Sequence, residues 1–384
     1  MPITLSAIAI ATLLSATTPT EPRSFTVHEW GTFTSFSGPV AQNVPHNLRI
    51  ADDLPPFVQA RFVGDRWFPA DTPDFIKNAL RCTHRMETPV IYFHSKSPLE
   101  LSVQVNMPKG LITEVYPPVS ASTPAKLESP TIPAEGSSIR WERVKVVPEA
   151  CCDSLSLPDA GASHYAHARK TKGDTVHVTH DGKEHAERFL FYRGVGNLDL
   201  GLTAAPLGAD QFKLTTPNAK PITHAFTLER LNGKLRFSEH RAVSNSSVLT
   251  LGNDNTTDSQ LESAMTSALT SAGLLPDEAA AMVSTWKHHW FGEEGTRVLV
   301  LLPQQVIDQH LPLTISPTPD KVTRVFVSRL EVLTPERLST IRDLLRNAEQ
   351  TDFDKLRLEN ELKKLGRFRD AAAQMARDAL DDGC

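Results

Sequence analysis

The stretch LELSVQVNM, residues 99–107, alternates apolar side chains at odd positions with polar side chains at even positions. Because successive residues of a strand point to opposite faces, this pattern predicts a half-buried antiparallel strand. The residues PKG at 108–110 predict a turn into a second strand over residues 111–116, so that the two would form a hairpin. The preceding run, residues 89–93, is apolar on both faces, which favours a central strand.

The period of two continues from about residue 25 to about residue 250, interrupted by proline and glycine rather than by helices. Asn232-Gly233 is typical of a type I′ hairpin turn, and Asp181-Gly182 predicts a similar one. The first turn places four apolar side chains on one face: Phe226, Leu228, Leu235 and Phe237. Many short strands without alternating helices predict an antiparallel β-sandwich-like domain over residues 25–255.

The pattern changes near residue 258, where apolar residues recur at helical spacing. The expected elements are, in order, a helix from Asp258 to a stop at Gly273, a helix from Pro276 that carries Trp286 and Trp290, strands over 297–302 and 324–333, a helix capped by Thr334, and two helices separated near Gly366. Residues 256–384 are therefore predicted to form a mixed α/β domain ending in helices. The predicted fold class is α+β.

Residues 1–24 contain an apolar run at 3–16, followed by the small polar string TTPT at 17–20. A run of about 14 residues is shorter than the roughly 20 that cross a bilayer core, so it is typical of a secretory signal peptide. No Lys or Arg precedes the run, and a buried N-terminal helix is the alternative. A cleaved signal peptide over 1–24 would deliver the mature chain to the periplasm or the cell exterior.

The composition is that of a globular protein large enough for two cores, with 384 residues, 40% of them hydrophobic and 22% charged. The formal net charge is −5 without any long run of like charges, so nucleic acid is not expected as a partner. No second segment has about 18 consecutive apolar residues. The mature chain is therefore expected to be soluble and to have no transmembrane span.

Several common catalytic motifs are absent, including the HExxH zinc helix, the GxSxG nucleophile elbow, the P-loop and the dinucleotide-binding GxGxxG. The candidate site residues are therefore polar residues within strongly patterned segments. His28 and Glu29 would point to opposite faces of a strand, so His28 alone is a candidate catalytic residue, with a structural role as the alternative. Trp30, in the same segment, is a candidate binding residue.

Arg85 and Glu87 stand two residues apart before the apolar run, which places them on the same side of a strand. They would form either a structural ion pair or an anion site. Arg85 is accordingly a candidate binding residue and Glu87 a candidate catalytic residue. Arg193 is a further catalytic candidate, and Arg169 is a further binding candidate.

The cysteine pair at 151–152 precedes His164 and His167. Thiolates and imidazoles are ligands that zinc and copper favour, and two His at i and i+3 face one way on a helical turn. His164 and His167 are therefore the candidate metal ligands. Adjacent cysteines seldom bind one metal together, so a disulfide with Cys82 or Cys384 is the alternative in an oxidising compartment.

His288 and His289 stand near the end of the Trp-containing helix, where a cationic imidazole is favoured by the helix dipole. Glu293 and Glu294 follow and could supply acid or base groups. The sequence does not show another carboxylate opposite them.

Four segments together resemble a family of uncharacterised exported bacterial proteins: VHEWGTFTS at 27–35, RMETPVIYF at 85–93, FLFYRGVG at 189–196, and the block from Trp286 through TRVLVLLP at 296–303. The resemblance spans most of the mature chain. It implies an envelope or secreted setting and carries no activity, cofactor or site residue with it.

The sequence therefore favours an exported protein that binds an unidentified ligand or an envelope component. The alternative is a metal-dependent hydrolase whose side chains converge at the domain boundary: His28, Glu87, His164, His167 and Arg193. There the metal would polarise a carbonyl or activate water while Glu87 moved protons. Neither hypothesis specifies a cofactor or a substrate.

Overall fold

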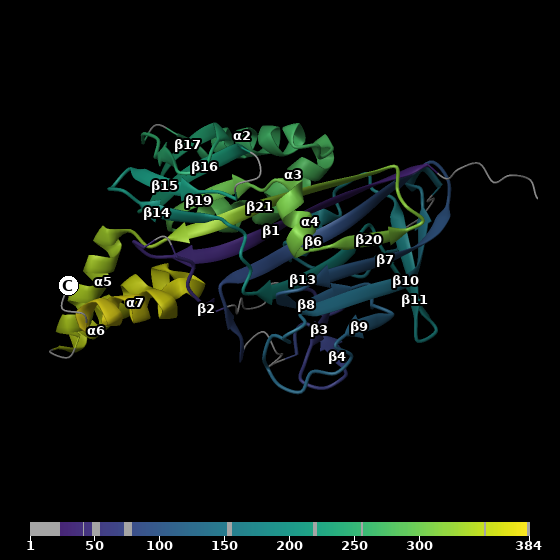
Figure 1. Ribbon diagram of the computed structural model, residues 1–384, viewed down its shortest axis with the longest axis horizontal. Coiled ribbons are helices and arrows are strands. Elements are labelled where there is room, and N and C mark those ends of the chain that lie inside the picture. The colour runs from purple at the N-terminus through teal and green to yellow at the C-terminus, as the bar shows by residue number, and fades with distance from the viewer. Residues whose placement is uncertain are drawn as a thin grey trace, which may run out of the picture.

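The computed structural model describes residues 24–381, except 41, 48–53, 73–78, 152–155, 218–220, 255 and 349–350. The predicted signal peptide, apart from Ser24, lies outside the described residues. The fold is mixed α+β, with two large sheets and helices layered on one of them (Figure 1). The α+β fold class is therefore confirmed.

A ten-stranded sheet forms the centre of the molecule. In spatial order its strands are β17 (Lys234–Val243), β16 (Ile222–Leu231), β19 (Gly295–Leu301), β21 (Lys321–Val332), β1 (Phe25–Ser37), β6 (His84–Ser95), β13 (Leu190–Gly196), β8 (Gly110–Tyr116), β3 (Gln59–Arg61) and β4 (Trp67–Pro69). β1 runs parallel to β21 and antiparallel to β6. The apolar run at 89–93 lies in β6, so its prediction as a central strand is confirmed.

The second sheet consists of β12 (Lys183–Glu187), β11 (Thr175–His180), β10 (Ser137–Val147), β7 (Leu99–Met107) and β20 (Leu313–Ser316), with β9 (Ala121–Thr123) beside β10. Burial alternates along β7 as predicted. The predicted hairpin between β7 and β8 is wrong, because β7 pairs with β10 and β20 while β8 pairs with β13. β8 is buried on both faces, whereas β7 has a polar outer face, so the chain crosses between the sheets at 108–109.

There are two further small sheets among the described residues. One consists of β14 (Thr203–Pro206), β15 (Gln211–Thr215) and β18 (Ser247–Thr250), and the other of β2 (His46–Asn47) and β5 (Arg81–Cys82). The helices are α1 (Tyr165–Ala168), α2 (Asp258–Ser271), α3 (Pro276–Lys287), α4 (Gln304–His310), α5 (Pro335–Asn347), α6 (Asp352–Lys364) and α7 (Arg369–Asp381). A π-helical turn, η3 (His288–Gly292), extends α3. Two short 3₁₀ helices are η2 (Glu149–Cys151) and η4 (Gly366–Phe368).

Three of the apolar clusters among the described residues hold the layers together. The two large sheets pack face to face around residues such as Val103, Trp141 and Ile91. α2 and α3 cover the opposite face of the ten-stranded sheet, where Trp286 and Trp30 belong to one cluster. α5, α6 and α7 form a third cluster with the end of β1 (Figure 1). The ten-stranded sheet therefore has a sheet-facing side and a helix-facing side.

The predicted domain boundary at 255/256 falls between β18 and α2. The central sheet joins strands from both sides of it, because β16 pairs with β19 and β1 pairs with β21. A division into two independently folding domains stays a prediction.

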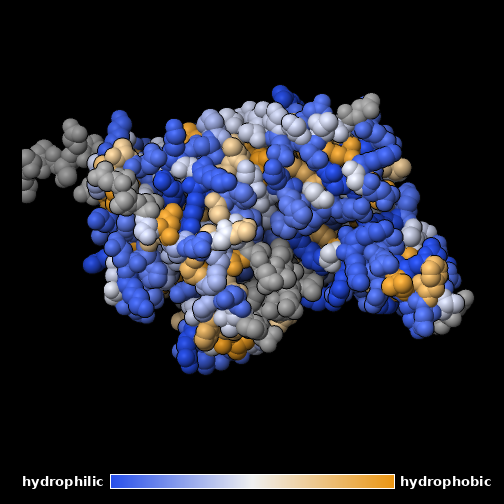
Figure 2. Space-filling view, turned by 180° about the vertical axis from the view of Figure 1, so that it is seen from behind, coloured by the Kyte–Doolittle hydropathy of each residue, from blue (hydrophilic) through white to orange (hydrophobic). Residues whose placement is uncertain are grey.

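Turn and helix signals in the sequence produced the expected local structures. Asn232 and Gly233 have φ of 51° and 78° and join β16 to β17. Thr257 accepts a hydrogen bond from the Gln260 backbone at the start of α2, and Pro335 opens α5 after Thr334. None of the described helices is long and apolar enough to cross a membrane. The surface seen in Figure 2 is mostly hydrophilic, with small groups of apolar residues.

A β-bulge at Thr88 changes which residues of β6 face the helices. Thr88 has φ of 47°, and the pairing of β6 with β1 and with β13 shifts register at this level. Before the bulge Glu87 faces the helices, where Arg367 binds it, and after the bulge Val90 joins the α3 cluster. A bulge inserts one residue and reverses the alternation. Charged and apolar residues of one strand therefore share one face.

Gly31 of β1 permits this bulge. A Cβ at Gly31 would lie 2.7 Å from the Phe326 ring and 3.1 Å from the Cα of Pro89. Only a residue without a side chain lets the backbones approach so closely. The glycine of HEWGTFT and the Thr-Pro of RMETP thus form one packing unit.

We expect Gly31→Ala to lower the free energy of unfolding by about 1–3 kcal/mol, because the added methyl group overpacks the bulge. Urea unfolding at neutral pH measures the effect. In a Phe326→Leu background the same change should cost less, since the ring that crowds the methyl group is gone. An equal cost in both backgrounds would contradict this account.

Candidate functional site

A row of buried polar side chains crosses five neighbouring strands on the helix-facing side of the central sheet. Its members are Arg297 of β19, Arg329 and Glu331 of β21, Thr34 of β1, Arg85 and Glu87 of β6, and Arg193 of β13. On β1, Thr34 lies between Trp30 of the α3 cluster and Phe36 of the α5–α7 cluster. The row therefore follows the seam between the two groups of helices.

Glu87 is at the centre of the row. One carboxylate oxygen, Oε1, lies 2.6 Å from Arg85 Nε and 2.7 Å from Arg367 Nη1, and Oε2 accepts a hydrogen bond of 2.8 Å from Thr34. Burial alone would raise the pKa of Glu87, but the positive charges of Arg367, Arg85 and Arg193 outweigh burial and hold the pKa well below its usual value. Glu87 is thus ionised at neutral pH, which suits it to hold charge rather than to move protons.

A second cluster joins β19 and β21 to the π-helical turn. Arg329 Nη2 lies 2.6 Å from Glu293 Oε2 and 2.7 Å from Glu331 Oε2, and Arg297 Nε lies 3.0 Å from Glu331 Oε2. The same arginines donate to carbonyls of η3: Arg297 to Trp290 at 2.9 Å and Arg329 to His289 at 2.8 Å. The two guanidinium groups therefore satisfy backbone acceptors that the end of a helix leaves unpaired.

The electrostatics of this cluster keep its groups charged. Burial would raise the pKa of Glu293, but Arg329 and the hydrogen bond from His289 lower it far below the usual range. Burial lowers the pKa of Arg297 to about 10, whereas Glu293 and Glu331 raise that of Arg329 against the same effect. Glu293, Arg297 and Arg329 are therefore all ionised at neutral pH.

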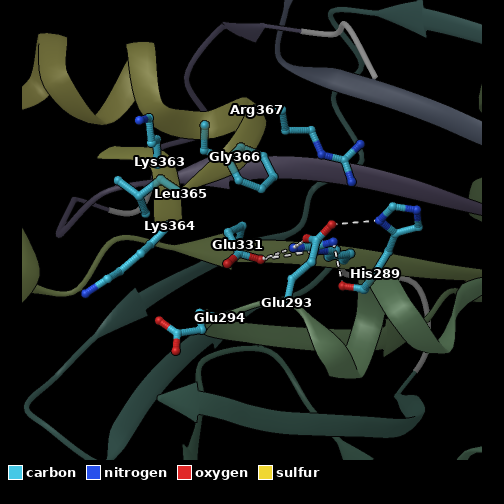
Figure 3. A pocket seen from close by; sticks show the side chains of 11 residues that line it. His289, Glu293, Glu294, Glu331, Lys363, Lys364, Leu365, Gly366 and Arg367 are labelled. Atoms are coloured by element: carbon cyan, nitrogen blue, oxygen red, sulfur yellow. Dashed lines mark hydrogen bonds and ion pairs between the residues drawn. The ribbon is translucent and has the colours of Figure 1, made fainter. Parts of the chain in front are cut away.

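A cleft of about 420 Å³ lies over this cluster, between η3 and the turn from α6 to α7 (Figure 3). Its lining includes His289, Glu293, Glu294, Arg329, Glu331, Lys363, Lys364 and Arg367. His289 Nδ1 lies 2.7 Å from Glu293 Oε1, and its Nε2 has no hydrogen-bond partner within the described part of the chain. Arg367 Nη2 is buried and equally without a partner among the described residues. Among the described residues, His289 Nε2 and Arg367 Nη2 are thus each able to form a further hydrogen bond at the cleft.

The structure brings several predicted site residues together near this cleft. Glu87, Arg85 and Arg193 belong to the row, and Arg193 Nη2 lies 2.8 Å from His164 Nε2. The His164 ring centroid lies 6.2 Å from that of His289. Arg85 and Glu87 form the ion pair that was one of the two predicted alternatives.

Other predicted residues lie elsewhere. His28 binds Glu278 on a different part of the sheet. Trp30 is completely buried beside Tyr92, so it packs the core instead of presenting a binding surface. Arg169 forms an ion pair of 2.7 Å with Glu187 and stacks on aromatic rings.

The predicted metal ligands, His164 and His167, do not belong to a described group of three potential ligands. His164 Nε2 is occupied by Arg193, and the one described group of three potential ligands with adjacent donor atoms contains neither His164 nor His167. Cys151 is an exposed free thiol, and Cys82 is a buried one, so the predicted disulfide to Cys82 is wrong. Residues 152 and 384 lie outside the described residues.

Four residues of the site were missed from the sequence: Arg297, Arg329, Glu331 and Arg367. Arg329 and Glu331 stand two apart in β21, the same spacing that identified Arg85 and Glu87. Arg367 follows Gly366 at a helix break and has no comparable local signal. Glu293, for which the sequence showed no opposing carboxylate, faces His289 and Arg329.

Comparison with protein-family models finds no match to this chain, and comparison with curated proteins finds none either.

We expect Glu87→Gln to lower the free energy of unfolding at pH 7 by about 3–5 kcal/mol, because it leaves buried arginines uncompensated. The folded pKa of Glu87 lies below its unfolded value of about 4.5, so its stabilisation is present above that pH and is lost as the pH falls further. Urea unfolding at a series of pH values from 7 to 3 should thus give a shallower acid slope in the variant.

Glu184→Gln provides the control, since Glu184 is mostly exposed and, among the described residues, pairs only with His177. It should change neither the stability at pH 7 nor the acid slope appreciably. Identical behaviour of the two variants would contradict the central role of Glu87.

Proposed function

We propose that this protein binds a small ligand carrying a carboxylate or phosphate group in the cleft between η3 and the α6–α7 turn. The observation that carries this proposal is the guanidinium of Arg367, whose side chain is only 6% exposed and whose Nη2 has no partner among the described residues. A buried charged donor without an acceptor is costly, and a ligand oxygen would satisfy it. Figure 3 shows Arg367 extending from the turn toward His289.

Two of the surrounding carboxylates, Glu87 and Glu293, are already engaged, whereas Oε2 of Glu294 has no partner among the described residues. Glu87 accepts from Arg367 Nη1 and Arg85, and Glu293 accepts from His289 and Arg329. An anionic ligand would therefore add an acceptor that the described side chains do not supply to Nη2. Arginine is suited to this because its planar fork can bind two oxygens at once.

The mouth of the cleft is positively charged on one side. Lys363 and Lys364 line it and are exposed at the end of α6. Charges at the rim attract an ion of opposite sign and raise its rate of association. Arg329 and Arg367 lie over the ring of Phe368, at 5.6 and 5.4 Å, which fixes their orientation toward the cleft floor.

Two energetically unfavourable backbone conformations lie beside the buried charges of the cleft. Thr88, a β-branched residue, has positive φ within a buried strand, and η3 is a π-helix. Such features are found preferentially at functional sites, because a regular alternative would be more stable. Their position beside the buried charges favours a ligand site over a purely structural ion network.

We also retain the proposal that the protein is exported and acts in the periplasm or outside the cell. It is supported by the apolar run at 3–16 and by the resemblance of residues 27–35, 85–93 and 189–196 to exported bacterial proteins. The ligand would then be a molecule of the envelope or of the medium. The α/β part of the chain supplies the cleft, and the β-rich part supplies Glu87 beneath it.

Isothermal titration with inorganic phosphate and with citrate tests the proposed binding. We expect saturable binding of at least one of these anions, and we expect Arg367→Gln to weaken it by about 10- to 100-fold, the loss of one charged hydrogen bond. Arg369→Gln is the matched control, because Arg369 is exposed two residues away and pairs with Asp370. Lys363→Gln should fold normally and weaken binding by a smaller factor.

If neither anion binds, or if Arg367→Gln and Arg369→Gln bind alike with both variants folded, the proposal is wrong. Circular dichroism and urea unfolding establish the folding of each variant, since Arg367 also contacts Glu87.

A second candidate function is hydrolysis with His289 as general base. Glu293 holds Nδ1 of His289 at 2.7 Å, which leaves Nε2 free at the cleft to accept a proton from water. A carboxylate that orients an imidazole in this way is a recurrent device of acid–base catalysis, and nearby arginines could stabilise a developing oxyanion. This candidate would act on the same anionic ligand.

For this candidate we expect slow release of 4-nitrophenol from 4-nitrophenyl phosphate, reduced at least 100-fold in kcat by His289→Asn. His288→Asn, at the exposed neighbouring position, should leave the rate unchanged. Equal rates in the two variants would remove His289 from catalysis without affecting the binding proposal.

A further inference from the structure

Two histidines and a glutamate converge at the opposite end of α3 from the cleft. His28 Nδ1 lies 2.8 Å from Glu278 Oε2, and His94 Nε2 lies 2.9 Å from Glu278 Oε1. The three potential ligand atoms lie within 4.8 Å of one another, and the two imidazole centroids are 5.0 Å apart. Three groups that can donate electron pairs therefore face a common point.

The sheet register produces the histidine pair. His94 pairs with Thr26 across β1 and β6, and His28 pairs with Tyr92, so the two histidines are diagonal neighbours on the helix-facing side. The β-bulge at Thr88 is required for this placement of the histidines. It reverses the alternation of β6, so that the even-numbered residues after the bulge, including His94, face the helices. Glu278 comes from the first turn of α3, which packs over these strands.

We propose that His28, His94 and Glu278 bind a divalent transition-metal ion, with Zn²⁺ as the representative ion. Imidazole nitrogens and a carboxylate oxygen are the donor set of many zinc sites with three protein ligands. Ligand atoms around a tetrahedral Zn²⁺ are separated by about 3.3 Å when each lies about 2.0–2.1 Å from the metal. The observed separations of 2.8, 2.9 and at most 4.8 Å bracket that value, so small side-chain rotations would complete the geometry.

The glutamate is held in place from behind. The backbone N–H of Leu275 donates to Glu278 Oε2 at 3.0 Å, as part of the cap of α3. A hydrogen bond from outside the ligand set fixes the orientation of a coordinating carboxylate. The side chain of Glu278 is fully buried, so its position is set by packing as well.

The site is open on one side. The His94 side chain is 21% exposed and lines a surface depression of about 440 Å³, together with Thr26, Ser95 and Asp174. Asp174 accepts backbone N–H groups of Ser95 and Glu149, so it belongs to the wall of the depression. A metal held by three protein ligands at such an opening would retain a position for water.

A hydrogen-bonded bridge that only fastens α3 to the sheet is the competing explanation. In it, each imidazole donates one proton to Glu278 and no ion is bound. The two explanations differ in one measurable property, the stoichiometric uptake of metal, and neither depends on the anion cleft.

Titration of chelator-treated full-length mature protein with Zn²⁺, in competition with a chromophoric indicator, tests the proposal. We expect one equivalent to bind, and we expect His94→Ala and Glu278→Gln each to weaken binding at least 100-fold. His177→Ala is the matched control, because His177 forms a comparable pair with Glu184 at 2.8 Å on an exposed hairpin. It should leave the affinity unchanged.

Co²⁺ substitution keeps the test independent of variants that fail to fold. The unaltered protein should show visible d–d absorption of the intensity typical of four- or five-coordinate cobalt, and Zn²⁺ should displace it. Absence of a one-equivalent site in the unaltered protein, or Zn²⁺ affinity in folded His94→Ala equal to that of His177→Ala, would overturn the proposal and leave the structural bridge.

Discussion

Glu87 is a fully buried carboxylate in the middle of the central sheet, and it stays ionised there because Arg85, Arg367 and Thr34 surround it. Burial of an ion costs several kcal/mol unless partners compensate it, so the elements that supply these partners must meet at one point. Arg367 lies between α6 and α7, at the other end of the chain from the strand that carries Thr34. Together with the apolar cluster of α5–α7, this charge therefore holds the α6–α7 turn, which is one wall of the cleft, onto the sheet.

The bulge at Thr88 makes that arrangement compatible with a packed core. Without it, a regular strand that directs Glu87 to the helices would direct Val90 and Tyr92 to the opposite sheet. With it, the charges lie under the seam between the helical groups and the apolar residues lie under α3. The three segments HEWGTFT, RMETPVIYF and FLFYRGVG are the strands that meet at this level, which explains why their polar residues and glycines occur together.

The sequence was sufficient to predict local secondary structure, but it was insufficient to predict which strands pair and which distant side chains meet. The alternation at 99–107 correctly predicted a half-buried strand, but strand pairing depends on contacts distant in the chain, and the neighbour of β7 proved to be β10. Two charges at i and i+2 correctly suggested the Arg85–Glu87 pair. The third partner, Arg367, is 280 residues from Glu87, and no local pattern encodes so distant a contact. For the same reason His28 was identified alone, without His94 or Glu278.

The two proposed sites share α3 as a common element. Its first turn presents Glu278 to His28 and His94, and the π-helical turn that extends it presents His289 to the cleft. Trp286, between them, and Trp290, directly after His289, are buried against the sheet, so the helix cannot slide along β1 without breaking apolar contacts. Arginines of β19 and β21 hold the far end through its carbonyls. Because a packed helix moves as a unit, an ion that fixes its first turn would also limit the positions available to His289. The position of His289 at the cleft would thereby depend on the same sheet registers that place His28 and His94.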